Sequence, residues 1–263
     1  MVDPRHLARQ HARAEARRGL RAVPTSLARG RERMAGVFQH RYPTVAVTGM
    51  TGVGKSELVE HLTGRPRPDA EVAEAGSAVL ERRVRRDRSL RGFRFRVVPG
   101  ENAATRLGAL DEVFHDDPVD GVLHLVAHGY ATGRRPAGTS GTIAVDREEQ
   151  LARELEDWTV TAHRIASMAV RRPRPTWLVV VVTKVDLFPD RVEEVVREYS
   201  PGSGTPFGDR LDELRALAGA AKLSVDVLPA CSRVDPDGPI PPARRDAYLD
   251  ALVARMGQLA GHR

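Results

Sequence analysis

Residues 49–56 read Gly49-Met-Thr-Gly-Val-Gly-Lys-Ser56, and this stretch sets the fold class. It matches the pattern GxxxxGK[ST] and stands between a short β-branched run, Thr44–Thr48, and a segment with helical apolar spacing at Leu58, Val59 and Leu62. Glycines in such a loop let backbone N–H groups wrap around phosphates, and the start of the helix adds its dipole. The stretch therefore predicts a strand, a phosphate-binding loop and a helix, in that order.

Every residue of this loop is a candidate phosphate ligand. Lys55 is expected to bridge the β- and γ-phosphates of a nucleotide and to take part in catalysis, and the Ser56 hydroxyl is expected to hold Mg²⁺. Of the 41 basic residues only Lys55, Lys184 and Lys222 are lysines. An ammonium and a guanidinium are not interchangeable where a compact charge is needed, so each lysine is informative. The candidate phosphate-binding residues are Gly49, Met50, Thr51, Gly52, Val53, Gly54, Lys55 and Ser56.

Apolar runs alternate with helical spacing through most of the remaining chain, which predicts an α/β fold: a doubly wound, mostly parallel sheet with helices on both faces. The run Thr176–Val182 (TWLVVVV) is fully apolar, as expected for a central strand covered on both sides. Residues 79–86 and 93–98 predict one antiparallel edge hairpin. Eight arginines lie between residues 82 and 96, and we expect them to form an exposed face.

Positive charge is concentrated at the beginning of the chain. Residues 1–41 carry ten arginines against three acidic residues, whereas the whole chain has a net charge of +6. We expect residues 1–42 to form an arginine-rich helix or arm, solvated or packed as a cap, and residues 43–263 to form one domain. A contact of the arm with nucleic acid or an anionic membrane is the alternative.

Hydropathy and cysteine usage predict a cytoplasmic protein. The longest apolar run is too short to cross a bilayer, and the beginning of the chain lacks the apolar centre of a secretion signal. A single cysteine, Cys231, excludes an intrachain disulfide. No transmembrane segment is expected.

A second motif, Thr183-Lys184-Val185-Asp186, follows the apolar run 176–182 directly. Ligands of open α/β sheets bind outside the carboxyl ends of the strands, so this motif and the phosphate loop can meet on one nucleotide. A carboxylate at Asp186 can accept hydrogen bonds from the ring N–H and exocyclic amine of guanine, a pattern that adenine lacks, and the Lys184 stem can lie along the base. Thr183, Lys184 and Asp186 are therefore candidate guanine-binding residues, which favours GTP over ATP.

With both motifs in place, residues 43–260 resemble the translation-factor-related class of P-loop GTPases, which includes Ras-like and dynamin-related members. The resemblance implies GTP and GDP as ligands, with Mg²⁺. It also implies a small loop after the next strand whose backbone amide touches the guanine O6, and Pro229-Ala230-Cys231-Ser232 stands at that place. Ala230, Cys231 and Ser232 are carried over as guanine-binding residues. The stretch Tyr199–Leu211 is similar to some bacterial regulatory GTPases.

The chain departs from that class at two catalytic positions. An Asp that orients the magnesium hydration shell is replaced by Val97 in Val97-Val98-Pro99-Gly100, although the Gly100 N–H is still expected to reach the γ-phosphate. Glu101 stands where Ras-like members have a water-positioning Gln. Between Gly64 and Gly100 there is no Thr to close over the metal, which leaves Ser77 as a candidate ligand. The resemblance therefore implies slow hydrolysis or activation by a partner.

The main hypothesis is a guanine-nucleotide-binding protein, a slow GTPase that acts as a switch toward a partner protein or through self-association. One alternative is a pseudo-GTPase scaffold that binds GTP without turnover, and another is an ATP-dependent small-molecule kinase. A protein that primarily binds nucleic acid through its basic arm is a third.

Two histidines, His124 and His128, are expected on one face of a buried strand because side chains alternate with a period of two. They form a conceivable metal pair, but a third ligand at a suitable spacing is missing from the sequence nearby. We expect two partly buried histidines with satisfied hydrogen bonds instead.

Overall fold

The computed structural model describes residues 42–64, 80–86, 92–100, 103–131, 146–232 and 238–261. A six-stranded sheet with the order β2-β3-β1-β4-β5-β6 forms its centre. Only the pair β2–β3, at one edge, is antiparallel, and the other four neighbouring pairs are parallel. The strands are β1 (Thr44–Thr48), β2 (Glu81–Arg86), β3 (Gly92–Val97), β4 (Gly121–Val126), β5 (Thr176–Val182) and β6 (Leu223–Pro229).

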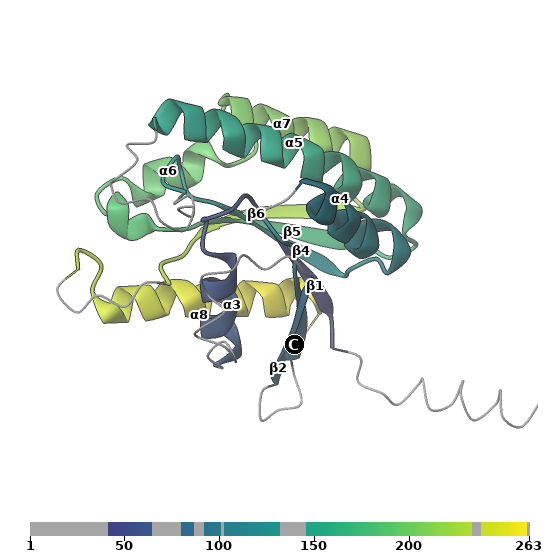
Figure 1. Cartoon of the computed structure of the whole chain (residues 1–263), viewed down its shortest axis with the longest axis horizontal. Coiled ribbons are helices and arrows are strands. Elements are labelled where there is room, and N and C mark those ends of the chain that lie inside the picture. The colour runs from purple at the N-terminus through teal and green to yellow at the C-terminus, as the bar shows by residue number, and fades with distance from the viewer. Residues whose placement is uncertain are drawn as a thin grey trace, which may run out of the picture. The chain divides into compact units, whose positions relative to one another are not determined.

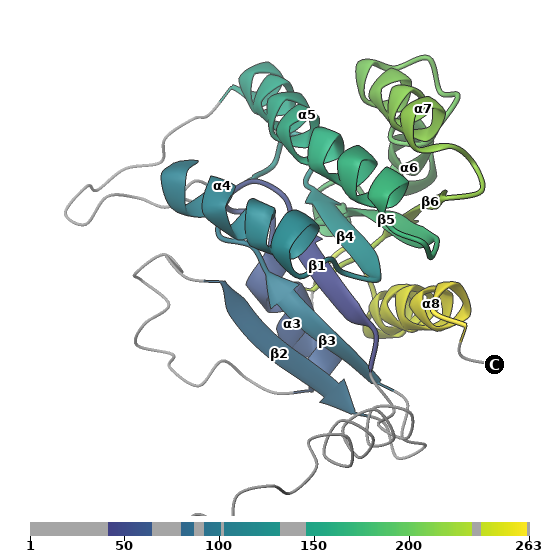
Figure 2. The ribbon, with the colours of Figure 1, turned by 90° about the vertical axis from the view of Figure 1, so that its right-hand side faces the viewer.

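Helices cover both faces of this sheet (Figures 1 and 2). Helices α4, α5, α6 and α7 lie on one face, and α3 and α8 lie on the other. The predicted fold class, a doubly wound and mostly parallel sheet with one antiparallel edge pair, is confirmed. The helices are α3 (Lys55–Thr63), α4 (Ala103–Asp111) with the π-helical turn η2 (Glu112–Asp116), α5 (Arg147–Arg171), the 3₁₀ turn η3 (Val185–Leu187), α6 (Val192–Glu198), α7 (Pro206–Ala218) and α8 (Pro242–Leu259).

Strand β5 explains why a fully apolar run is needed at the centre. Leu178, Val180 and Val182 pack into the core under α4 to α7, whereas Val179 and Val181 pack into the core over α3 and α8. All five are fully buried. Because the side chains of a strand alternate between faces, a strand covered on both sides must be apolar at every position. Strands β1, β5 and β6 run in the same direction, so the loop 49–54 after β1, the motif 183–186 after β5 and the loop 230–232 after β6 lie at the same edge of the sheet.

The antiparallel edge pair differs from the prediction of an exposed arginine face. Arg82 is largely exposed, but the side chain of Arg96 is only 5% exposed and pairs with Glu112 at 2.5 Å and Asp117 at 3.1 Å. Residue 96 of β3 lies on the sheet face over which α4 and η2 pass, and η2 supplies Glu112. Burial of this arginine is therefore made possible by acidic partners that are distant in sequence.

Replacing Gly121 by Ala is expected to destabilise the fold. Gly121 opens β4 opposite Trp177 of β5, and a Cβ on Gly121 would overlap the indole ring. Such overpacking of a buried site costs about 2 kcal/mol of unfolding free energy. Urea unfolding followed by circular dichroism measures the change. Gly108→Ala in α4 is the control, since its Cβ would meet open space and a helix prefers alanine. Equal urea midpoints for the two variants would contradict the packing argument.

Candidate functional site

The loop between β1 and α3 is shaped by glycines in left-handed conformations. Gly49, Gly52 and Gly54 have φ angles of 127°, 80° and 93°. Lys55, the first residue of α3, is 8% exposed, and its Nζ donates hydrogen bonds to the carbonyl oxygens of Gly49 at 2.7 Å and Met50 at 2.9 Å. The loop thus curls around a buried ammonium at a helix N-terminus, which is the geometry that phosphate binding requires.

Gly100 reaches the same loop from the end of β3. A Cβ at this position would lie 2.7 Å from the backbone N of Thr51, 2.7 Å from its Oγ1 and 2.8 Å from Nζ of Lys55. Only glycine allows two backbone segments to approach this closely. The structure therefore brings Gly100 and Lys55 together, as expected for two groups that share a γ-phosphate. Glu101 and Ser77, the other residues predicted from this region, lie outside the described residues.

Magnesium has one candidate ligand in this part of the site. Ser56 follows Lys55 in the first turn of α3 and is half-buried. Val97 occupies the place where the resemblance expects an Asp, and it is 4% exposed within the apolar core. At these two positions the chain offers Mg²⁺ a hydroxyl and no carboxylate. Within the described ranges, no group of three or more His, Cys, Asp or Glu side chains is placed to hold a metal ion.

Thr183 connects the base motif to the phosphate loop. Its backbone N–H donates to the carbonyl of Val126 in β4 at 2.8 Å, and its hydroxyl donates to the carbonyl of Val53 at 2.8 Å. Thr183 is 4% exposed. The sequence predicted a guanine-binding residue here, and the structure shows the side chain hydrogen-bonded between the two motifs. Loop and base motif are thereby fixed to one edge of the sheet.

Lys184 is held in an unusual backbone conformation. Its φ of 56° lies in the left-handed region, and its Nζ donates to the carbonyl of Tyr130 at 2.9 Å. The Tyr130 ring stacks on Phe188 with ring centroids 5.8 Å apart, and the Arg147 guanidinium lies 5.0 Å from the Tyr130 ring centre. Burial lowers the pKa of Lys184. Tyr130 therefore fixes the end of the Lys184 side chain, and Phe188 and Arg147 pack against the Tyr130 ring in turn. This arrangement lies beside the expected place of the base.

Asp186 and the loop after β6 lie in contact. The Cys231 thiol lies 3.5 Å from Oδ1 of Asp186, and Ala230 is fully buried beside it. The Ala230 N–H donates to the carbonyl of Val182 at 2.8 Å. This hydrogen bond ties the loop to β5. Guanine contacts of Ala230, Cys231 and the half-buried Ser232 remain predictions.

A buried polar cluster lies behind the phosphate loop. The Thr48 hydroxyl and Nδ1 of His124 are 3.0 Å apart, and the edge of the His124 ring packs on Trp158. Burial, assisted by the charges of Arg106 and Lys55, lowers the pKa of His124 to about 3, so this ring is neutral. His124 therefore has the hydrogen-bond partner that the sequence predicted, and it is fully rather than partly buried.

His128 differs from that prediction. Strand β4 ends at Val126, and His128 stands in the following turn with a φ of 50°, so the period of two does not extend to it. Its ring packs edge-on against Phe188 and Tyr199. Among the described residues neither ring nitrogen has a hydrogen-bond partner. The expectation of two equivalent, satisfied histidines is wrong for this residue.

Helix α5 carries two buried acidic residues that its apolar spacing alone does not identify. Glu154 is 2% exposed and accepts hydrogen bonds from the backbone N–H of Ala127 at 2.8 Å and from the Tyr199 hydroxyl at 2.9 Å. Burial raises the pKa of Glu154. Asp157 pairs with Arg106 of α4. Both acids stand on the buried side of α5, Glu154 one turn before Trp158 and Asp157 one turn before Thr161, and that placement is the signal that reveals them.

None of the helices within the described ranges combines the length and apolar character of a bilayer-spanning segment. No protein-family model and no curated protein sequence matches the chain.

Comparison with solved structures gives neighbours that are P-loop GTPases. A GTP-binding protein of Sulfolobus solfataricus in complex with GDP shares 15% identity at a TM-score of 0.45, over 90% of this chain and 57% of that one. A bacterial selenocysteine-specific elongation factor shares 12% identity at a TM-score of 0.49, and the match covers 84% of this chain and 29% of that one. A single-substitution variant of Era of Aquifex aeolicus, bound to GDP·AlF₄⁻, shares 19% identity at a TM-score of 0.41, and the match covers 83% of this chain and 56% of that one. The chain thus spans between about a third and three fifths of these structures.

Proposed function

We propose that the chain binds guanine nucleotides and hydrolyses GTP slowly, as a switch that engages a partner protein or a second copy of itself in its GTP-bound form. The observation that carries this proposal is the hydrogen bond from the Thr183 hydroxyl to Val53. It joins a phosphate-binding loop and a carboxylate-bearing base motif at the carboxyl edge of one parallel sheet, where open α/β folds bind ligands.

The phosphates would be held by the backbone N–H groups of residues 49–56 and by Lys55. In this structure the Lys55 ammonium contacts two loop carbonyls, so it is already positioned at the centre of the cradle. Phosphate oxygens offer this ammonium a partner of opposite charge, and charge-assisted hydrogen bonds of this kind are the strong ones. Gly100 lies against the same ammonium and would add its N–H at the γ-phosphate.

The base would be selected by Asp186. A carboxylate accepts two hydrogen bonds from the guanine ring N–H and its exocyclic amine, whereas adenine presents an acceptor at the ring nitrogen. The Cys231 thiol, 3.5 Å from Oδ1, supports the orientation of this carboxylate. Lys184, fixed by Tyr130, would lie along the base with its stem.

Slow hydrolysis follows from the missing carboxylate at position 97. Catalysis of phosphoryl transfer depends mostly on electrostatic positioning around the phosphates. Mg²⁺, when bound, would neutralise phosphate charge there, and Ser56 is the described residue suited to hold it. Because Val97 is buried and apolar, position 97 does not supply the carboxylate that usually orders the water around that ion. The same observation favours the second candidate function, a scaffold that binds GTP without turnover.

Fluorescent GTP and ATP analogues, titrated with and without Mg²⁺, test the binding proposal. We expect GTP to bind at least about tenfold more tightly than ATP, a difference of about 1.4 kcal/mol. Equal competition by ATP and GTP would instead indicate the small-molecule kinase. Absence of saturable binding of GTP and GDP under every metal condition would reject nucleotide binding altogether.

Phosphate release separates the two guanine-binding candidates. A slow release of phosphate that disappears in Lys55→Ala supports the GTPase, and tight GTP binding without release supports the scaffold. RNA and DNA binding at low salt, compared between the full chain and a chain without residues 1–41, tests the predicted alternative role of the basic arm.

A further inference from the structure

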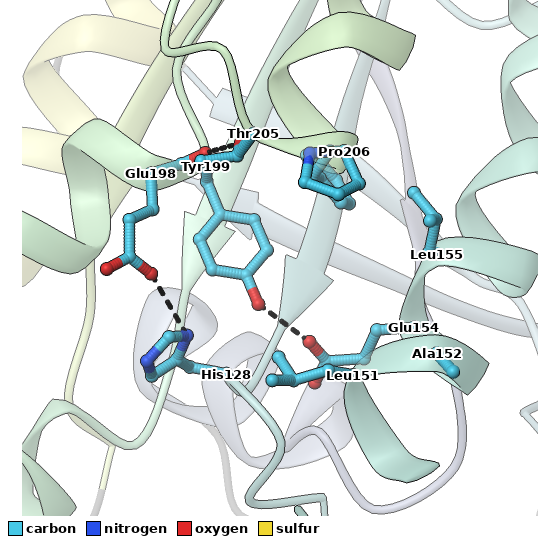
Figure 3. A pocket seen from close by; sticks show the side chains of 10 residues that line it. His128, Leu151, Ala152, Glu154, Leu155, Glu198, Tyr199, Thr205 and Pro206 are labelled. Atoms are coloured by element: carbon cyan, nitrogen blue, oxygen red, sulfur yellow. Dashed lines mark hydrogen bonds and ion pairs between the residues drawn. The ribbon is translucent and has the colours of Figure 1, made fainter. Parts of the chain in front are cut away.

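A cavity of about 340 Å³ lies between α5, the end of α6 and the start of α7 (Figure 3). Its volume falls in the range of sites that bind small molecules, about 300 to 1,000 Å³. None of its lining residues belongs to the predicted nucleotide site. The lining consists of His128, Leu151, Ala152, Glu154, Leu155, Glu198, Tyr199, Thr205, Pro206 and Phe207.

One polar group in the cavity is left without a hydrogen bond. His128 is 4% exposed, its ring lines the cavity, and neither ring nitrogen has a hydrogen-bond partner among the described residues. Its Nδ1 lies 3.8 Å from Oε2 of Glu198, which is beyond hydrogen-bond distance. A buried polar group without a partner is costly in free energy, so such a group points to a ligand or an ordered water.

The other polar groups of the lining are already paired. Tyr199 donates to Glu154, Glu154 accepts from two further backbone N–H groups, and the Thr205 hydroxyl donates to the carbonyl of Glu198. Unused hydrogen-bonding capacity therefore faces the cavity at one end, from His128 and from Oε2 of Glu198. The other oxygen of this carboxylate, Oε1, is paired with the Arg191 guanidinium at 3.4 Å. Figure 3 shows these two side chains together, with the apolar Leu155 and Pro206 on the opposite side.

The polar end favours a cationic donor. Burial, together with the charges of Arg147 and Arg191, lowers the pKa of His128 to about 4, so the ring is neutral at pH 7 and one nitrogen is an acceptor. With the proton on Nε2, Nδ1 and the carboxylate oxygen of Glu198 are two acceptors that face each other. An ammonium can donate to both from about 2.9 Å, whereas a carboxylate ligand has no hydrogen atom to donate to either acceptor.

The apolar end favours an aromatic or aliphatic body. Tyr199 and Phe207 supply aromatic surface, and Leu151 and Leu155 supply aliphatic surface. Aromatic faces also attract a nearby cation. We propose that this cavity is a binding site for a small organic amine, with its ammonium between His128 and Glu198 and its apolar body between α5 and α7.

The cavity adjoins the predicted base site without sharing its residues. The ring of His128 packs 5.3 Å from that of Phe188, which follows Asp186 by two positions. The carbonyl of Tyr130, two residues after His128, accepts the hydrogen bond of Lys184. Amine binding itself requires no nucleotide, so the proposal does not rest on the proposed function.

Titration of the full chain with 2-phenylethylammonium, in the absence of nucleotide, tests the proposal. We expect saturable binding by calorimetry and a shift of the His128 ring signals in ¹⁵N-histidine NMR spectra. Ethylbenzene, which lacks the charge, and 3-phenylpropionate, which reverses it, are expected to bind at least about tenfold more weakly, since a hydrogen bond to a charged group contributes that much. Equal binding of 3-phenylpropionate, or no binding of the amine, would overturn the proposal.

Two sets of variants locate the site. Glu198→Gln removes one charge from a partly exposed side chain and is expected to weaken amine binding about tenfold. Ala152→Phe places a ring into the cavity from an exposed helical position and should abolish binding, whereas Ala216→Phe on the exposed side of α7 should leave it unchanged.

Unchanged amine affinity in both Glu198→Gln and Ala152→Phe would place the amine elsewhere and reject the site. Lys55→Ala is expected to bind the amine normally, which keeps failure of the nucleotide proposal distinguishable.

Discussion

Lys55→Ala is expected to weaken GTP binding at least about 100-fold, a loss of about 2.8 kcal/mol. The ammonium of Lys55 is 8% exposed and sits inside the loop, where its charge is poorly screened by water. Alanine removes the positive charge and the two hydrogen bonds to Gly49 and Met50 that shape the loop. The measurement is displacement of a fluorescent GDP analogue by GTP.

A matched lysine provides the control for that substitution. Lys222→Ala removes an ammonium that donates to the carbonyl of Arg172 at 2.8 Å, on the connection before β6. Its GTP affinity should equal that of the wild type. Lys55→Arg should fail to restore binding, because a planar guanidinium does not fit a cradle built for a compact charge. Wild-type affinity in Lys55→Ala would show that the loop does not bind the phosphates.

Asp186→Asn is expected to remove base selectivity while leaving phosphate binding intact. The amide replaces one carboxylate oxygen with an N–H₂ donor, which faces the donors of guanine and eliminates charge assistance. GTP affinity should fall about 100-fold, whereas ATP affinity should stay near its wild-type value. Competition of GTP and ATP against a fluorescent nucleotide measures both in one experiment.

The same exchange four residues later is the control. Asp190 is exposed in the turn after η3, so Asp190→Asn changes the net charge equally without touching the base site. It should keep the wild-type preference for GTP. A parallel fall of GTP and ATP affinity in Asp186→Asn would indicate a structural role for this carboxylate and would contradict its assignment to guanine.

Contiguous motifs explain why the sequence predicts so much of this site. The loop 49–56 and the tetrapeptide 183–186 each follow an apolar strand, and the parallel sheet brings both strand ends to one edge. The strand order alone brings the two motifs together, so no contact between distant side chains is needed to predict that they meet. Gly100 was predicted from the resemblance to P-loop GTPases, and it does lie against Thr51 and Lys55.

Contacts between distant segments explain what the sequence does not predict. Arg96 is buried only because Glu112 and Asp117 approach it from another segment. Glu154 and Asp157 are carboxylates inside an apolar helix stripe, and their partners come from the turn after β4 and from α4. His128 leaves the strand pattern because the chain turns after Val126. The periodicity of apolar residues describes one helix or strand at a time, so it does not predict hydrogen bonds or ion pairs between distant segments.

The hydroxyl of Thr183 has a thermodynamic consequence for ligands bound as proposed. Since it clamps the phosphate loop at Val53 to the base motif, the distance between the two half-sites is preset. An intact nucleotide then benefits from a chelate effect: once its phosphates are seated, its base meets the second half-site at high effective concentration. Guanosine and pyrophosphate, supplied as separate molecules, gain no such advantage, so they should occupy the two half-sites together far more weakly than GDP does.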